Sequence, residues 1–183
     1  MKWECLSKEY VLNNRWLRVR KDSVSLPSKV ILNDYYVIEK NDVCLIIPVT
    51  SDNKVLLKRE YRYPVDLHMI ELPGGTMENI LESALEVAQR ELLEETGYTS
   101  QHWKSIGVLY DYPTKDTNKI NLFVAEKIEQ VSLPKTDYSE NIEFSLYEMD
   151  EVWDMVMNGS INVSGSVAAL LKYMNEINYK KNG

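Results

Sequence analysis

The most constraining feature of the chain is a glycine turn followed by a glutamate-rich stretch. Residues 71–76 read Glu-Leu-Pro-Gly-Gly-Thr, and residues 90–98 read Arg-Glu-Leu-Leu-Glu-Glu-Thr-Gly-Tyr. A helix is predicted over residues 81–96 by an apolar stripe of Leu85, Ala88 and Leu92 with the neighbouring Leu81 and Leu93, and Gly97 predicts its end. Side chains three or four residues apart share one face of a helix. We therefore expect three carboxylates to gather beside Arg90. They belong to Glu91, Glu94 and Glu95.

Carboxylates gathered in this way repel one another unless a cation lies between them. Hard divalent cations prefer oxygen ligands, and Mg²⁺ binds a few carboxylates together with waters and substrate phosphates. The patch therefore predicts a metal site, with Glu91 and Glu95 as the main ligands and Glu94 next. A solvent-facing glutamate-rich helix has the same spacing. The glycines at both ends favour the metal site, because they define a short, bounded helix.

The same stretch resembles the signature of the Nudix hydrolases, which cleave nucleoside diphosphates linked to another moiety. The matching pattern is Glu82, seven residues, and then the run over residues 90–98. The family pattern has one residue fewer between a glycine and the first glutamate than the six that separate Gly75 from Glu82. The extra residue falls in a loop, where insertions are tolerated. It leaves open whether the carbonyl of Gly74 or of Gly75 reaches the metal.

The resemblance implies an α+β fold, the α/β/α sandwich of the Nudix domain, over residues 42–183. Residues 1–41 alternate as half-buried strands do. They resemble the N-terminal antiparallel sheet of the ADP-ribose pyrophosphatase branch, which exchanges that sheet in a homodimer. We expect strands over residues 16–21, 30–32, 35–39, 43–49, 55–62, 102–109, 120–125 and 142–147, with Asn33–Asp34 interrupting the early ones. Further helices are expected over residues 151–157, ended by Asn158–Gly159, and over residues 167–177.

The resemblance also implies roles for residues beyond the main carboxylates. Arg90 orients them as part of the catalytic group, unless it is only a helix salt-bridge partner. Glu82 is an outer metal ligand or a partner of Arg90. In this branch a glutamate from a later loop acts as the base that accepts a proton from the attacking water. Glu140 is the candidate here, with Glu143 in reserve, although this segment also fits an exposed acidic loop.

Substrate contacts are expected from two further segments. Arg62 and Glu71 lie in the region where the branch carries an arginine that reaches the substrate phosphates, a task suited to a guanidinium. Glu60 stands where glutamine is usual, and a surface ion pair would explain Arg62 equally well. In the loop over residues 113–118, a Pro-Thr-Lys sequence replaces the usual Pro-Gly and following acidic residue. Lys115 would bring positive charge toward a terminal phosphate or sugar.

These features predict a Mg²⁺-dependent pyrophosphohydrolase, with Mn²⁺ as a substitute, acting on ADP-ribose or a nucleoside diphosphate sugar such as GDP-mannose or UDP-glucose. A nucleoside triphosphate pyrophosphatase and a non-catalytic nucleotide-sugar sensor are the alternatives. The net charge of -7 argues against non-specific nucleic acid binding. The N-terminus has no signal-peptide core, and the longest apolar run, residues 43–49, is too short to span a bilayer. We expect a cytoplasmic homodimer without a membrane partner.

Overall fold

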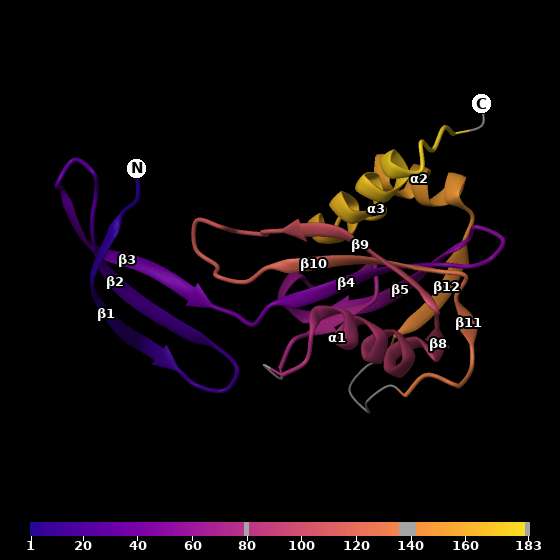
Figure 1. Ribbon diagram of the computed structural model, residues 1–183, viewed down its shortest axis with the longest axis horizontal. Coiled ribbons are helices and arrows are strands. Elements are labelled where there is room, and N and C mark those ends of the chain that lie inside the picture. The colour runs from indigo at the N-terminus through magenta and orange to yellow at the C-terminus, as the bar shows by residue number, and fades with distance from the viewer. Residues whose placement is uncertain (79–80, 136–141, 182–183) are drawn as a thin grey trace. The chain divides into compact units, whose positions relative to one another are not determined.

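The structure is a computed structural model that describes residues 1–78, 81–135 and 142–181. The chain divides into two compact units. Unit 1 comprises Met1–Asp42 and Tyr110–Lys119, and unit 2 comprises Val43–Leu109 and Ile120–Gly183. Figure 1 shows the elements of each unit. Within the described ranges, none of the helices combines the length and apolar character needed to cross a bilayer.

Unit 1 contains a three-stranded antiparallel sheet in the order β1 (Glu4–Asn13), β2 (Arg18–Ser25) and β3 (Ile31–Glu39). Strand β1 is absent from the sequence expectations because all its residues are exposed, so it shows no buried face. The predicted interruption at Asn33–Asp34 is wrong. These two residues lie opposite Ser23 where the pairing register shifts, and they form a bulge within a continuous strand.

Unit 2 is built on a seven-stranded mixed sheet in the order β12-β5-β4-β10-β9, with β6 on β5 and β7 on β4. Its strands are β4 (Val43–Val49), β5 (Val55–Arg62), β6 (Leu67–Glu71), β7 (Gly74–Thr76), β9 (His102–Leu109), β10 (Ile120–Glu126) and β12 (Glu143–Tyr147). Strands β4 and β10 are parallel. A short 3-10 helix, η1 (Tyr63–Val65), follows β5, and β8 (Tyr98–Thr99) pairs with β11 (Glu129–Gln130) in a separate small sheet.

Helices cover both faces of this sheet. Figure 1 shows α2 (Met149–Met157) and α3 (Ser164–Glu176) on one face and α1 (Ala84–Glu91) on the other. Neighbouring residues of β4 alternate between the two layers, as a strand requires. Ile47 packs in the cluster that holds the α2 and α3 side chains, whereas Ile46 packs in the cluster that holds those of α1. The predicted α/β/α sandwich is confirmed.

Helix α1 begins at Ala84, later than the predicted start at residue 81. Ser83 caps it: its hydroxyl accepts a hydrogen bond from the N–H of Glu86 at 3.3 Å, and the Glu86 carboxylate accepts one from the N–H of Ser83 at 2.7 Å. This reciprocal pair satisfies N–H groups that a helix start leaves without partners. Leu81 therefore precedes the helix and is exposed, which corrects its expected place in the apolar stripe.

The second half of the predicted helix is not α-helical. After Glu91 the chain forms a π-helical segment, η2 (Leu92–Thr96), which Gly97 ends with a φ of 74°. Such segments widen the helix locally and often occur at functional sites. The end at Gly97 is as predicted, but the buried stripe differs in part. Val87, Ala88 and Leu92 are buried, whereas Leu85 and Leu93 are exposed.

The Pro-Gly-Gly segment is a strand and not the tight turn that the sequence predicts. Strand β7 pairs antiparallel with β4, and neither of its glycines has a positive φ. Their lack of a side chain serves close packing instead. A Cβ on Gly74 would overlap the carbonyl oxygen of Cys44, and a Cβ on Gly75 would overlap the side chain of Glu91.

Candidate active site

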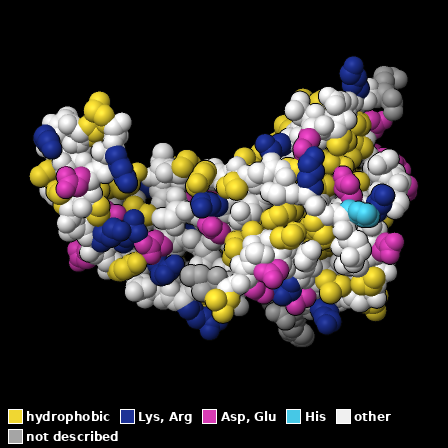
Figure 2. Space-filling view, in the orientation of Figure 1, with side chains coloured by type: hydrophobic (Ala, Val, Ile, Leu, Met, Phe, Trp, Pro, Cys, Tyr) yellow, Lys and Arg dark blue, Asp and Glu magenta, His cyan; other side chains and the backbone are white. Residues whose placement is uncertain are grey.

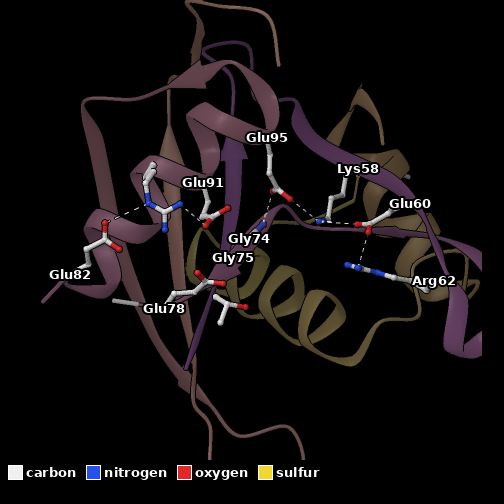
Figure 3. Close-up of a pocket in the computed structure, with 11 residues that line it drawn as sticks. Lys58, Glu60, Arg62, Gly74, Gly75, Glu78, Glu82, Glu91 and Glu95 are labelled. Carbon is white, nitrogen blue, oxygen red and sulfur yellow. Dashed lines mark hydrogen bonds and ion pairs between the residues drawn. The ribbon is translucent and has the colours of Figure 1, made fainter. Parts of the chain in front are cut away.

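Unit 2 contains a cavity of about 700 Å³ between β5, β7 and the segment that begins before α1 and runs through η2. Figure 3 shows its lining side chains, most of which are charged. The charged lining residues are Lys58, Glu60, Arg62, Glu78, Glu82, Arg90, Glu91 and Glu95. Five carboxylates and three cations leave these residues with a formal charge of −2. The cavity is therefore suited to a cationic group, or to an anionic substrate that arrives with cations.

Strand β5 supplies one wall of the cavity through its period of two. Lys58, Glu60 and Arg62 are alternate residues, so they project from the same face of the strand. Leu56, the preceding residue on that face, packs in the cluster that holds the side chains of α1. The same alternation that buries Leu56 below α1 thus directs the three charged side chains into the cavity.

Lys58 is deeply buried for a lysine, with an exposed fraction of 5%. Its Nζ lies 3.0 Å from Glu95 Oε1 and 3.1 Å from Glu60 Oε2. Burial by itself would lower the pKa of Lys58, but the charges of Glu95 and Glu60 outweigh it and hold the pKa above its ordinary value. Lys58 is therefore a charged ammonium group between two carboxylates.

Glu95 is held from two sides. Its Oε1 accepts a hydrogen bond from Lys58, and its Oε2 accepts one from the N–H of Gly74 at 3.1 Å (Figure 3). Burial raises the pKa of Glu95, and the Lys58 charge and the Gly74 hydrogen bond oppose that rise. The position of the Gly74 N–H depends on the pairing of β7 with β4. That pairing requires a glycine, because a Cβ on Gly74 would overlap the carbonyl oxygen of Cys44.

Glu91 lies directly over the backbone of Gly75. The Nη1 of Arg90 donates a hydrogen bond to Glu91 Oε1 at 2.9 Å. Burial raises the pKa of Glu91, and the Arg90 charge opposes it. A desolvated carboxylate of this kind gains from a nearby cation. Glu78 lines the same cavity (Figure 3).

Arg90 connects the remaining predicted carboxylates. It donates a hydrogen bond to Glu94 Oε2 at 3.0 Å, and its Nε lies 3.6 Å from Glu82 Oε1. Glu82 precedes the helix start, so the ideal-helix spacing that would place it opposite Glu91 does not apply to it, and it reaches Arg90. Glu94 is about half exposed and does not line the cavity. The same Nη1 also contacts Glu91, so Glu91 and Glu94 meet at Arg90, whereas Glu95 is held by Lys58 and the Gly74 N–H.

Arg62 is held by two carboxylates at the other end of the cavity. It donates hydrogen bonds to Glu71 Oε1 from Nε at 2.9 Å and to Glu60 Oε1 from Nη1 at 2.8 Å. Glu71 is buried and does not line the cavity. In the register of β5 and β6, Glu71 lies opposite Lys58 and Leu67 lies opposite Arg62, so the long Arg62 side chain extends along the sheet to reach Glu71. Arg62 faces the cavity with its guanidinium already paired.

Two of the three remaining predicted site residues are described. Lys115 belongs to unit 1, where its Nζ lies 4.8 Å from the centre of the Tyr35 ring. Glu143 begins β12 and pairs with Arg59 at 3.2 Å on the exposed side of β5. Glu140 lies outside the described residues.

Sequence reasoning did not assign site roles to Lys58, Glu60 or Glu78. A signal for the first two exists in β5, where buried aliphatic residues give way to charged residues at every second position. A half-buried strand that ends in this way predicts a polar pocket at its end. The contact of Lys58 with Glu95 has no such signal, because 37 residues separate the two in the chain.

The comparisons with known proteins identify the family. A model of the NUDIX domain matches residues 40–161. The chain belongs to the Nudix family. A second family model, the nucleoside diphosphate sugar hydrolase N-terminal domain, matches residues 3–38 of this Nudix hydrolase. The predicted relationship to the ADP-ribose pyrophosphatase-like branch is confirmed by these matches together with the relatives described next.

Two relatives match this Nudix hydrolase over most of their own length. An ADP-ribose pyrophosphatase of Bacillus subtilis (strain 168) is 25% identical over 159 residues, which cover 81% of this chain and 85% of the relative. A GDP-mannose pyrophosphatase of Salmonella paratyphi B is 27% identical over 181 residues, which cover 92% and 93%. The crystal structure of an ADP compounds hydrolase superposes with a TM-score of 0.86 at 23% identity, covering 97% of this chain and 95% of that one. The last match supports the fold.

Nudix hydrolases generally use divalent metal ions, and the cavity of this one fits such an ion in its donor chemistry. Carboxylate oxygens line the cavity. Burial raises the pKa of Glu91 and of Glu95, so a nearby positive charge would stabilise their ionised forms. Among the described residues, no three acidic, histidine or cysteine side chains converge closely enough to form a ready-made metal site. Lys58 and Arg90 already contact these carboxylates. A divalent ion would therefore share them with two built-in cations.

Proposed function

We propose that this Nudix hydrolase cleaves the diphosphate of ADP-ribose or a related nucleoside diphosphate sugar, yielding a nucleoside monophosphate and a sugar phosphate. The observation that carries the proposal is the pair of desolvated carboxylates, Glu91 and Glu95, held against the glycine backbone of β7 inside a charged cavity. The substrate class is supported by the pyrophosphatase names of relatives that match along most of the chain.

Glu91 and Glu95 would hold the metal ion, Mg²⁺ or Mn²⁺, with the Gly74 carbonyl, Glu82 and Glu94 as further candidate ligands. When bound, such an ion neutralises phosphate charge and acidifies a water molecule. Arg90 keeps Glu91 turned toward the cavity through its hydrogen bond, and it draws Glu82 and Glu94 toward the same guanidinium. Its role is to position carboxylates.

A base must accept the proton of the attacking water. We keep Glu140 as the candidate, on the basis of its place in the chain. Glu143 is the reserve. It begins β12, which contributes no residue to the described cavity lining, and its carboxylate pairs with Arg59. The two glutamates can be separated by parallel substitution.

Substrate binding is assigned to Arg62, Glu71 and Lys115. Arg62 lines the cavity and its side chain is 40% exposed, so a phosphate can approach its guanidinium. Glu71 fixes the orientation of the Arg62 side chain, because it accepts a hydrogen bond from the Arg62 Nε. Lys115 is assigned through its loop, whose sequence differs from that of the branch at Pro113–Asn118.

We further propose that residues 1–41 form a dimerisation domain and residues 42–183 the catalytic domain. Several large apolar side chains of unit 1 are exposed, and Figure 2 shows apolar side chains among charged ones. They include Trp3, Leu6, Tyr10, Val11, Leu12, Trp16 and Leu17. Exposed apolar surface of this kind marks an interaction site, and a second copy of the chain is the proposed partner. A monomeric mass by light scattering would refute the dimer.

The test of the function is a panel of nucleoside diphosphate sugars, ADP-ribose and nucleoside triphosphates, incubated with enzyme and Mg²⁺ while released phosphomonoester is measured. We expect turnover of ADP-ribose or a nucleotide sugar, and its loss by orders of magnitude in Glu95→Gln. Circular dichroism checks that this variant stays folded. Turnover confined to the triphosphates would replace the proposal with the triphosphate pyrophosphatase, and near wild-type activity of Glu95→Gln would remove the carboxylates from the mechanism.

A further inference from the structure

We propose that Lys58 is a built-in cation of the carboxylate cradle, which limits how many divalent ions Glu95 and its neighbours bind and how tightly. Its ammonium group occupies a position between two carboxylates that a metal ion could otherwise share. This inference rests on the metal-dependent function proposed above and goes beyond it, because it assigns to a side chain of β5 the control of metal stoichiometry.

The first step is the burial of the ammonium group. Lysine is almost never fully buried unless it is paired, and Lys58 is 5% exposed with its Nζ within 3.1 Å of both Glu60 and Glu95. An ammonium group removed from water requires such partners, because desolvation of a charge is costly. The alternating geometry of β5 holds the lysine in place. Lys58 is a permanent part of the cavity wall.

The second step is the occupancy of Glu95. Both of its carboxylate oxygens already accept hydrogen bonds, Oε1 from Lys58 and Oε2 from the Gly74 N–H. In Glu91, by contrast, only Oε1 accepts a hydrogen bond from the described residues. A metal ion can therefore approach Glu91 more freely than Glu95. Binding at Glu95 brings the ion close to the ammonium group, and like charges at this range repel strongly in a poorly solvated site.

The third step is the incomplete hydrogen bonding of Glu60. Its Oε2 is buried and lies 3.1 Å from the Lys58 Nζ, but this contact has poor hydrogen-bond geometry, and the oxygen has no other partner among the described residues. Lys58 is thus oriented toward Glu95, with which it forms a proper hydrogen bond at 3.0 Å. Glu60 contributes negative charge on the other side of the ammonium group. The ammonium group acts chiefly on Glu95.

The fourth step is the charge of the cavity. The charged lining residues sum to −2 with Lys58 present, which one divalent ion neutralises, and loss of the lysine would leave −3. If Lys58 were only a structural ion pair, its removal would change stability without changing metal binding. The two readings therefore differ in a quantity that can be measured without substrate.

The experiment counts Mn²⁺ bound to the full chain without nucleotide, from the electron paramagnetic resonance signal of free Mn²⁺. For the wild type we expect about one ion per chain, because the lining charge is −2. For Lys58→Met we expect a second ion or an affinity at least about tenfold higher. Because this variant leaves two carboxylates uncompensated, the double variant Lys58→Met/Glu60→Gln is measured beside it. It keeps the cavity charge at −2, and tighter binding there isolates the effect of the ammonium group on Glu95.

The matched control is Lys54→Met. Lys54 also contacts two carboxylates, Glu148 at 3.1 Å and Asp52 at 3.6 Å, but it lies outside the cavity. The Lys54→Met variant should bind Mn²⁺ with the stoichiometry and affinity of the wild type. Unchanged affinity and stoichiometry in the folded double variant would overturn the role of Lys58. A wild-type chain that binds no Mn²⁺ would instead overturn the metal-dependent function itself, so the two failures are distinguishable.

Discussion

Replacing Gly75 by alanine tests whether the close contact between β7 and Glu91 matters for catalysis. An added Cβ would lie 2.5 Å from Glu91 Oε1 and closer still to the carbons of the same side chain, whereas ordinary contacts begin at 3.4 Å. The carboxyl group must therefore move by roughly 1 Å. A misplacement of about 1 Å at a reacting centre costs about 10²-fold in rate. We expect kcat/KM to fall by about that factor, which corresponds to roughly 2.7 kcal/mol of transition-state stabilisation.

The fold should tolerate the change, because the atoms in the way belong to a side chain. The chain loses some freedom when unfolded, which stabilises the folded state by about 0.4–1 kcal/mol, and a strained Glu91 rotamer costs a similar amount. The melting temperature should therefore change little. Gly74→Ala is the matched control, because its Cβ would meet the backbone of Cys44 and Leu45. Backbone shifts of this kind cost about 1–3 kcal/mol, so this variant should melt several degrees lower.

The assay measures phosphomonoester release from the best substrate of the panel, alongside thermal unfolding of both alanine variants. Activity loss without destabilisation in Gly75→Ala, set against destabilisation in Gly74→Ala, is the expected pattern. A Gly75→Ala variant with wild-type kcat/KM would refute the reasoning, since it would mean that Glu91 need not lie where β7 places it.

Two further predictions concern the cap of α1 and the base. Ser83→Ala removes the capping box and should lower the free energy of unfolding by about 1 kcal/mol. The melting temperature should then fall by roughly 2–4 °C. An unchanged melting temperature would show that the cap is not needed. Glu140→Gln should lower kcat far more than it changes KM, because a base acts only in the chemical step, whereas Glu143→Gln should lose only an exposed ion pair with Arg59. If Glu143→Gln is the variant that loses kcat, the base is the reserve candidate.

Elements with a strong local pattern are predictable from the sequence. The buried strands β4, β5 and β10 and the helices α2 and α3 lie close to their expected positions, because each carries its own apolar periodicity. Gly97 and Gly159 lie just beyond the helical segments they were expected to end, both with positive φ. These features depend on a few neighbouring residues.

Elements without a buried face of their own were missed or misread. Strand β1 is fully exposed, and β6 and β7 form by pairing with strands already in place. The start of α1 was placed too early because Leu81 extends the apolar spacing past the true cap at Ser83. In each case a long-range pairing or a side-chain hydrogen bond outweighs the local preference.

The sequence by itself indicated the family, through the resemblance of Glu82 and residues 90–98 to its signature, and with the family the sandwich fold. It also placed Glu91 and Glu95 about one helical turn apart, because that spacing is local. Only the tertiary structure decided what each carboxylate contacts. The Gly74 N–H reaches Glu95 across 21 residues and the Lys58 ammonium group reaches it across 37. Those contacts depend on the register of β7 on β4 and on which face of β5 turns toward η2. Strand register is set by the packing of whole layers, and a one-residue shift would reverse every side chain.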